Sequence, residues 1–194
     1  MKELRTACLL LAVLTVLLGA AYPLAVTGVC RLLWPRRADG SLVRTGGRTV
    51  GSALISQSFT GPSYFHGRPS DCGHDAAGSA SSNLGPSNPA LLDLVRQRVA
   101  DVRRTNGLDS AAAVPSELVL ASASGLDPDL SPAAAMLQTR RIARARNLPE
   151  ATVAALVRRM SRGAFLGVFC LPRVNVLELN LALDSLSRNA AVEP

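Results

Sequence analysis

No charged residue occurs between positions 6 and 30, and most side chains in this run of 25 residues are apolar. At about 1.5 Å per residue, a helix of that length can cross a hydrocarbon core of about 30 Å. We therefore predict a short N-terminal cap over residues 1–5 and a transmembrane helix over residues 6–30. Residues 31–194 should then form a single folded domain, in keeping with its length.

A cleavable signal peptide is the competing interpretation of the same region. Lys2 and Arg5 precede the apolar residues 7–18, and the small residues 19–21 follow. Cleavage at that point would leave residues 22–34 as a new apolar terminus with nothing to cover it. We therefore favour a retained anchor.

Beyond position 40 the apolar pattern changes its period. Residues 42–50 read as two short strands joined at Gly46-Gly47, which suits the tight turn of a hairpin, and Leu54-Ile55 can extend the second strand. Further along the chain, apolar residues recur with the period of a helix, after an Asn or Ser cap and a proline at the start of the segment. They predict helices over 89–106, 132–146 and 149–162, and short apolar runs predict strands at 118–120 and 165–169. The fold class is therefore α+β, one transmembrane helix followed by a domain with a small antiparallel sheet.

The sequence pattern near the C-terminus fits either a strand or a helix. Leucines alternate with polar residues between Leu177 and Leu183, as in a strand. Asn175, followed three residues later by Glu178, resembles a helix-capping box instead. Because leucine-rich segments also favour helix, we predict a helix over Val176–Ser187.

Two segments between these elements suit contact with another molecule. Residues 59–88 form a long glycine- and serine-rich loop, and loops of that length are usually functional or disordered. Ser122, Ser124 and Gly125 make a second turn before Asp127-Pro128. Rigid turns offer amide and carbonyl groups to a partner at little ordering cost.

The helix predicted over 132–146 carries four arginines, at positions 140, 141, 144 and 146. Such a run is usually a solvated helix face. Docking onto acidic residues of a partner is the alternative, since arginine binds carboxylate through two parallel hydrogen bonds. Both interpretations stay open.

Composition excludes several classes of protein. The formal net charge is +7, but Lys2 is the only lysine and aromatic residues make up only 4%, so base-stacking surfaces for nucleic acid are not expected. A phosphate-binding loop needs a lysine before Ser or Thr, and neither that motif nor a Gly-x-Ser-x-Gly elbow or His-Glu-x-x-His helix occurs. We therefore expect no catalytic residues and no nucleic-acid partner.

One loop has the spacing of a metal site, with Asp71, Cys72, His74 and Asp75 close together and His66 upstream. A polar loop supplies such sets by chance, so we predict a solvated loop without a metal.

The four cysteines divide by position. Cys8 and Cys30 fall in the apolar span, whereas Cys72 and Cys170 fall in the folded part. The latter two can pair if that part lies outside the cytoplasm, but we favour free thiols.

Five blocks of sequence together resemble the C subunit of the Kdp potassium-transporting P-type ATPase, the KdpC family. The blocks are Gly51-Ser52-x-Leu54-Ile55-x-Gln57, Tyr64–Ser70, Ser82–Asn88, Ala121–Ala135 and Arg173–Asp184. They occur in order after the anchor and span nearly all of the chain. Departures from the family pattern fall at Asp71-Cys72, at Ala80-Ser81 and at Phe169–Leu171.

This resemblance implies a non-catalytic accessory subunit of an ATP-driven, high-affinity potassium import complex in the cell (inner) membrane. Its partners would be a channel-like potassium-binding subunit, the P-type ATPase subunit and a small single-span subunit. The family is also described as promoting ATP binding by the pump subunit, with ATP reached only through the complex and no cofactor bound stably. A domain outside the cytoplasm cannot touch cytosolic ATP, so direct contact and that placement exclude each other.

Charge alone does not decide which side the folded domain occupies. Lys2 and Arg5 precede the span, and Arg31, Arg36 and Arg37 follow it, so the positive-inside rule gives no clear orientation. The extracytoplasmic placement follows from the resemblance only.

The loop, the turn and the arginine-bearing helix together predict a partner-binding surface. Its residues are Tyr64, Phe65, Arg68, Pro69, Asn83, Gly85, Ser122, Ser124, Gly125, Asp127, Arg140 and Arg144. Two other functions remain open: a membrane-anchored extracytoplasmic binding or sensor module without a pump partner, and an exported enzyme that uses the loop at positions 71–75.

Overall fold

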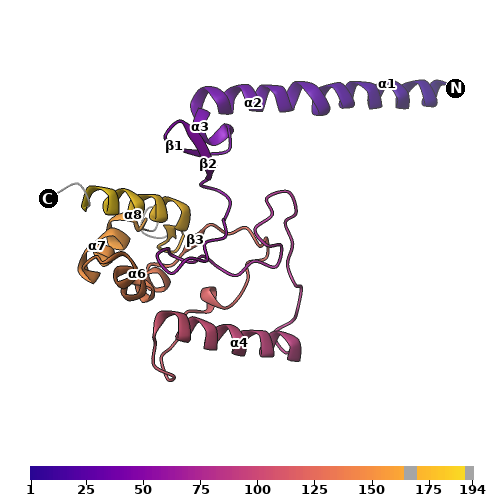
Figure 1. Ribbon diagram of the computed structural model, residues 1–194. Helices are drawn as coiled ribbons and strands as arrows, with labels where there is room; N and C mark the ends of the chain where they lie inside the picture. Colours follow the sequence, from indigo (N-terminus) through magenta and orange to yellow (C-terminus); the bar gives the residue numbers. More distant parts are fainter. Residues whose placement is uncertain (164–169, 191–194) are drawn as a thin grey trace. The chain divides into compact units, whose positions relative to one another are not determined.

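The structure is a computed structural model that describes residues 1–163 and 170–190, without the side chains of 188–190. The strand predicted at 165–169 therefore lies outside the described residues. The chain divides into two compact units, Met1–Ser52 and Ala53–Pro194, which we describe separately; Figure 1 labels their elements.

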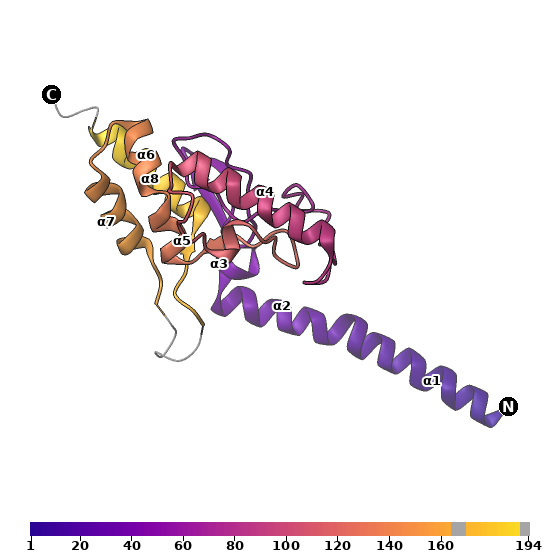
Figure 2. The same cartoon turned by 90° about the horizontal axis from the view of Figure 1, so that it is seen from below.

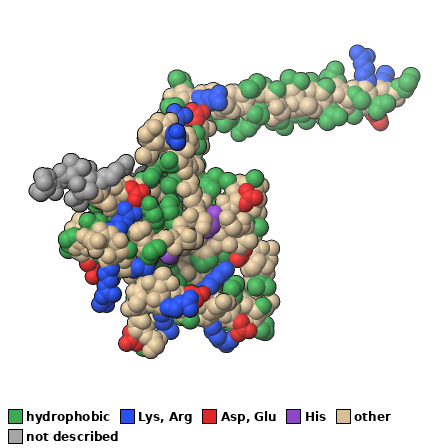
Figure 3. All heavy atoms as spheres, in the orientation of Figure 1, with side chains coloured by type: hydrophobic (Ala, Val, Ile, Leu, Met, Phe, Trp, Pro, Cys, Tyr) green, Lys and Arg blue, Asp and Glu red, His purple; other side chains and the backbone are tan. Residues whose placement is uncertain are grey.

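A long helix fills most of the first unit. It runs as α1 (Lys2–Val16), a π-helical turn η1 (Leu17–Ala21) and α2 (Tyr22–Leu33), and residues 2–33 are long and apolar enough to cross a membrane. Pro23 explains the wide turn, because proline has no N–H for the carbonyl four residues back and its ring crowds that carbonyl. Charged side chains gather at the two ends of this helix (Figure 3).

A short helix and a hairpin complete the first unit: α3 (Pro35–Ala38), β1 (Leu42–Thr45) and β2 (Arg48–Ser52). The strands pair antiparallel, as predicted, with a bulge between Val43 and Arg44. Gly46 and Gly47 both have positive φ angles, +58° and +77°, which the two-residue turn requires. The extension of the second strand through Leu54-Ile55 was wrong, because β2 ends at Ser52.

The second unit begins with an irregular chain and then α4 (Pro89–Asn106). The Asn88 side chain caps this helix by accepting a hydrogen bond from Ala90 N at 2.9 Å, and Gly107 ends it with a φ of +62°. Both boundaries match the sequence prediction. The strand predicted at 118–120 was wrong: Ser116–Leu118 is a 3-10 turn (η2), whose Ser116 carbonyl accepts hydrogen bonds from Val119 N and Leu120 N.

The helix predicted over 132–146 is divided in two, α5 (Pro132–Leu137) and α6 (Thr139–Arg146). The break falls at Gln138, whose side chain is buried and holds another segment of the chain. Helix α7 (Glu150–Met160) follows.

The C-terminal helix α8 (Val176–Ala190) confirms the helical prediction for the leucine-rich tail. Asn175 Oδ1 accepts from Glu178 N at 3.0 Å, so the cap outweighs the alternation of leucines. A two-residue antiparallel pair, β3 (Asp129–Leu130) with β4 (Val174–Asn175), precedes it and was not predicted.

Helices α5 to α8 lie together around one core in Figure 2. Its buried members include Leu130, Ile142, Leu156 and Leu183. Phe65 is fully buried in the same core and is the only buried apolar side chain described before Leu118. The irregular chain is therefore anchored to the helices at Phe65.

Candidate functional site

The irregular segment around Phe65 is held by side chains of distant helices. The amide of Asn180, in α8, accepts from Phe65 N at 2.8 Å and donates to Phe65 O at 3.0 Å. Gln138, between α5 and α6, does the same for His66, at 2.8 Å and 3.0 Å. Both amides are 1% exposed. Two consecutive residues thus have their backbone groups satisfied without a neighbouring strand.

Two arginines of α6 hold the residues just before Phe65. Arg141 donates to the carbonyls of Pro62 and Tyr64, and its Nε donates to Asn106 Oδ1 at 3.0 Å. Burial lowers the pKa of Arg141 to about 10, a value at which the guanidinium remains charged at neutral pH. Arg141 therefore links α6, α4 and the segment.

Arg146 completes this set of contacts. It donates to Ser63 O at 2.7 Å, pairs with Asp184 of α8 at 2.7 Å and lies 4.8 Å from the ring centroid of Tyr64. The solvated-face interpretation of the four arginines was thus wrong for Arg141 and Arg146. Arg140 and Arg144 are exposed and have no side-chain partner among the described residues, which suits a solvated face and a docking face equally.

Arg68 and Asp127, both predicted to bind a partner, bind each other at 2.8 Å. Arg68 Nη2 also donates to the carbonyls of Leu120 and Ala121, at 3.4 and 3.3 Å. Its Nε is the one buried side-chain polar atom without a partner in the described part of the chain. The pair joins the loop to the turn at 122–127.

The turn itself packs against residues 70–80 of the loop. Gly125 is buried with a φ of +69°, and its carbonyl accepts from Ser70 Oγ at 2.7 Å. A Cβ at this position would lie 2.6 Å from Cys72 Sγ and 2.8 Å from Ala80 O. Ser122 is also buried, so the interior of this turn is closed to a partner, whereas Ser124 is exposed.

The remaining predicted residues differ in exposure. Asn83 and Gly85 are exposed, and Tyr64 and Pro69 are half-buried. Phe65 belongs to the core, so its assignment as a contact residue was wrong: the side chain has no exposed surface.

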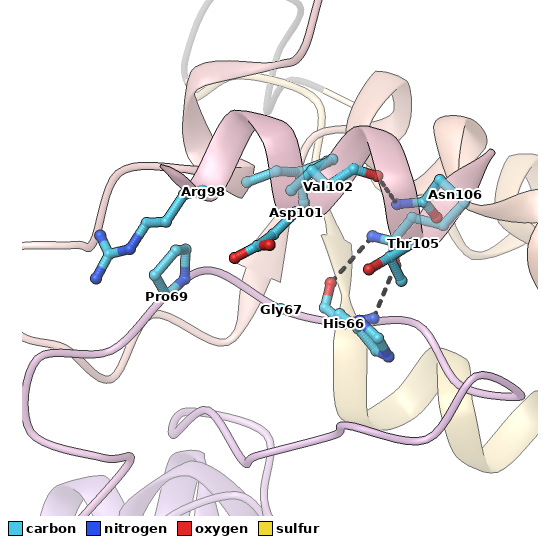
Figure 4. A pocket seen from close by; sticks show the side chains of 10 residues that line it. His66, Gly67, Pro69, Arg98, Asp101, Val102, Thr105 and Asn106 are labelled. Carbon is cyan, nitrogen blue, oxygen red and sulfur yellow. Dashed lines mark hydrogen bonds between the residues drawn. The ribbon is translucent and has the colours of Figure 1, made fainter. Parts of the chain in front are cut away.

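A hollow of about 280 Å³ lies between α4 and the segment His66–Pro69 (Figure 4). The Asp101 carboxylate points toward Gly67, while Arg98 points away from the hollow. No hydrogen bond joins Asp101 or Thr105 to His66 among the described residues, because His66 Nε2 pairs with Gly61 O and Asp101 with Arg104.

In the loop at positions 71–75, which has the spacing of a metal site, side chains form hydrogen bonds within the protein. His74 Nδ1 lies 2.8 Å from Ser56 Oγ, and Cys72 Sγ lies 3.3 Å from Ser70 Oγ, a contact that lowers the pKa of the thiol. Burial lowers the pKa of His74 and of His66. No group of three or more His, Cys, Asp or Glu is placed to hold a metal within the described residues. All four cysteines are free.

A family profile described as "KdpC: K+-transporting ATPase, c chain" matches residues 4–185, which include the long helix and nearly all of the folded part. The chain belongs to the KdpC family.

Members of this family match the chain over almost its full length. The chain is 54% identical over 186 residues to the "Potassium-transporting ATPase KdpC subunit" of Polaromonas naphthalenivorans (strain CJ2), with 94% of each chain covered. It is 54% identical over 185 residues to the KdpC subunit of Variovorax paradoxus (strain S110), covering 94% and 95%, and 50% identical over 190 residues to that of Gemmatimonas aurantiaca, covering 96% and 94%. The resemblance inferred from the five sequence blocks is confirmed.

The predictions from the sequence of this KdpC chain missed four residues that hold the backbone of residues 62–66: Gln138, Arg141, Arg146 and Asn180. One feature did point to Asn180: it is an amide within the leucine-rich stretch LELNLALD, and a polar residue on a buried helix face needs a hydrogen-bond partner.

Proposed function

We propose that this KdpC chain is a non-catalytic accessory subunit of an ATP-driven potassium import complex. Residues 6–30 anchor it in the membrane, and residues 31–194 form an extracytoplasmic domain. The family match over 4–185 supports the complex, and the apolar helix supports the anchor. The proposed partners are the channel-like potassium-binding subunit, the P-type ATPase subunit and the small single-span subunit.

The domain acts by docking, through a surface whose backbone is already ordered. Side chains of α6 and α8, together with Gln138 between α5 and α6, hold the backbone of residues 62–66. The pair of Arg68 and Asp127 joins the loop to the turn at 122–127. A partner that binds here loses little chain entropy, and that favours affinity. The buried members of the predicted surface shape it, and its exposed members make the contact.

Arg140 and Arg144 carry the strongest support for docking. They are four residues apart on α6 and therefore share a helix face, and neither has an internal partner among the described residues. Arg141 and Arg146 on the same helix are fully engaged. The two free guanidiniums suit acidic side chains of a partner subunit, which they can bind in bidentate geometry.

Promotion of ATP binding is, in this proposal, indirect. The chain binds no ATP and no cofactor, and assembly with it favours the conformation of the pump subunit that binds ATP. Coupling of this kind requires only that the subunit bind that conformation more tightly.

The test compares two double variants in the assembled complex. We expect Arg140→Gln with Arg144→Gln to reduce the amount of pump subunit that co-purifies with this chain, and to reduce potassium-stimulated ATPase activity in the membrane to the same extent. Arg158→Gln with Arg159→Gln is the matched control, because those arginines are also exposed and lack described partners. It removes the same charge and should leave both measurements unchanged.

Two results would contradict this proposal. Equal recovery of the pump subunit with both double variants would show that α6 does not dock. Loss of an activity of the purified chain, with recovery intact, would show that the chain is itself an enzyme.

A further inference from the structure

The end of the membrane helix carries a concentration of unpaired positive charge. Five arginines lie between residues 31 and 48, at positions 31, 36, 37, 44 and 48, against the single acidic residue Asp39. Arg31 and Asp39 are 3.8 Å apart and both exposed, so this pair is weak. The other four have no side-chain partner among the residues that the structure describes.

A hollow lies at the same place. The chain bends at Trp34 (φ −138°, ψ 61°) between α2 and α3, and a hollow of about 380 Å³ is lined by Cys30, Trp34, Arg37 and Ala38. The lining thus combines a tryptophan and two small residues with an arginine. The Trp34 residue remains 52% exposed.

The length of the helix places this hollow at the membrane surface. Residues 2–33 form 32 residues of helix, about 48 Å at 1.5 Å per residue, against a hydrocarbon core of about 30 Å. With the uncharged residues 6–30, about 38 Å of helix, crossing that core at a tilt, Trp34 and Arg37 fall in the headgroup layer, where tryptophan is enriched.

We propose that this hollow binds one anionic phospholipid, with Arg37 on the phosphodiester and Trp34 against the upper acyl chain. A phosphodiester accepts hydrogen bonds from a guanidinium in parallel pairs, and the acyl chain covers the apolar lining. The nearby arginines raise the local concentration of anionic headgroups. An acidic peptide could satisfy the charge but would leave the apolar part of the lining uncovered. The proposal depends on the membrane anchor and not on the accessory role.

Trp34 is the only tryptophan in the chain, so its fluorescence reports on this hollow directly. The full chain is placed in nanodiscs of phosphatidylcholine and phosphatidylglycerol in which one lipid at a time has acyl chains brominated near the headgroup. At equal mole fractions, we expect quenching by brominated phosphatidylglycerol to correspond to about fivefold local enrichment over phosphatidylcholine.

Two variants separate a built site from general attraction to the membrane. Arg37→Gln should remove most of the enrichment, whereas Arg5→Gln removes a charge at the other end of the helix and should leave it unchanged. Equal quenching by the two lipids in the wild-type chain would overturn the proposal, as would identical enrichment in both variants.

The complex assembled with tryptophan-free variants of the partner subunits supplies one further outcome. If Trp34 is shielded there from both brominated lipids, a partner protein occupies the hollow and the lipid proposal is wrong. Persistent preference for phosphatidylglycerol in the complex supports it, whatever the Arg140 and Arg144 variants show.

Discussion

The side-chain amide of Asn180 exchanges two hydrogen bonds with the backbone of Phe65, 115 residues earlier in the chain. An amide can replace a neighbouring strand in this way because its carbonyl oxygen accepts and its NH2 group donates, side by side, as the backbone groups of a strand do. Gln138 repeats the arrangement at His66. The segment that belongs to the YFHGRPS block thus depends on two amides for its conformation.

Replacing Asn180 with leucine should therefore destabilise the folded domain. The change leaves a buried N–H and a buried C=O of Phe65 without partners, which costs about 2–4 kcal/mol in the free energy of unfolding. Denaturant unfolding of the full chain in mild detergent measures this. Gln97→Leu, an exposed amide on α4, is the control and should stay within about 0.5 kcal/mol. Equal stability of the two variants would show that water or a shifted backbone replaces the amide.

Neighbouring arginines on α6 should respond very differently to the same substitution. Arg141→Leu removes donors to Pro62 O, Tyr64 O and Asn106 Oδ1, and should lower the free energy of unfolding by at least about 2 kcal/mol. Arg140→Leu removes an exposed side chain and should change it by less than about 0.5 kcal/mol. Thermal unfolding of both variants under one condition is sufficient. A large loss with Arg140→Leu would mean that the exposed face of α6 also packs internally.

Gly125→Ala should disorder the contact between the turn and the loop. The new methyl would lie too close to Cys72 Sγ and Ala80 O, and the positive φ disfavours any side chain. We expect faster amide hydrogen exchange over residues 70–85, while the helical core remains protected. Gly85→Ala is the control, since nothing lies within 4 Å of a Cβ there. Reduced assembly after a change at Gly125 would then reflect a lost turn conformation, not a lost direct contact.

The two histidines predict a decrease in stability on mild acidification. Burial lowers the pKa of His66 and of His74 below 6.5, so near that pH the unfolded chain takes up protons that the folded chain does not. The free energy of unfolding should therefore fall as the pH drops below about 6.5. His66→Gln, whose amide can still donate to Gly61 O, should flatten the slope, and adding His74→Gln should flatten it further.

The carboxyl of Asp129 makes stability depend on pH with the opposite sign, in a lower pH range. Burial raises the pKa of its carboxyl above 3.8, so the folded state retains a proton there that the unfolded state releases, and stability decreases as the pH rises through that range. Unfolding free energies measured at a series of pH values separate the two effects.

The outcome that would contradict the histidine prediction is an unchanged slope of unfolding free energy below pH 6.5 in the variant with both His66→Gln and His74→Gln. It would assign the pH dependence to other groups.

Local chemistry in the sequence determined the long apolar helix, the hairpin and several of the helix ends. The uncharged run over 6–30, the glycines at the hairpin turn, the Asn88 and Asn175 caps and the terminating Gly107 each act within a few residues. Such signals need no partner from elsewhere in the chain, so they can be read before the fold is known. The resemblance to the KdpC family could be recognised from the sequence for a similar reason, because its blocks are short, continuous segments.

Only the tertiary structure decided which side chains face the core, which hold the loop and which remain free for a partner. The sequence shows four arginines on one helix, yet Arg141 and Arg146 are engaged internally while Arg140 and Arg144 are exposed. It likewise offers Phe65 as a surface aromatic, and the structure buries it against helices more than 60 residues away in sequence. The physical reason is that burial and hydrogen bonding depend on groups brought together from distant parts of the chain, and no local pattern records those groups.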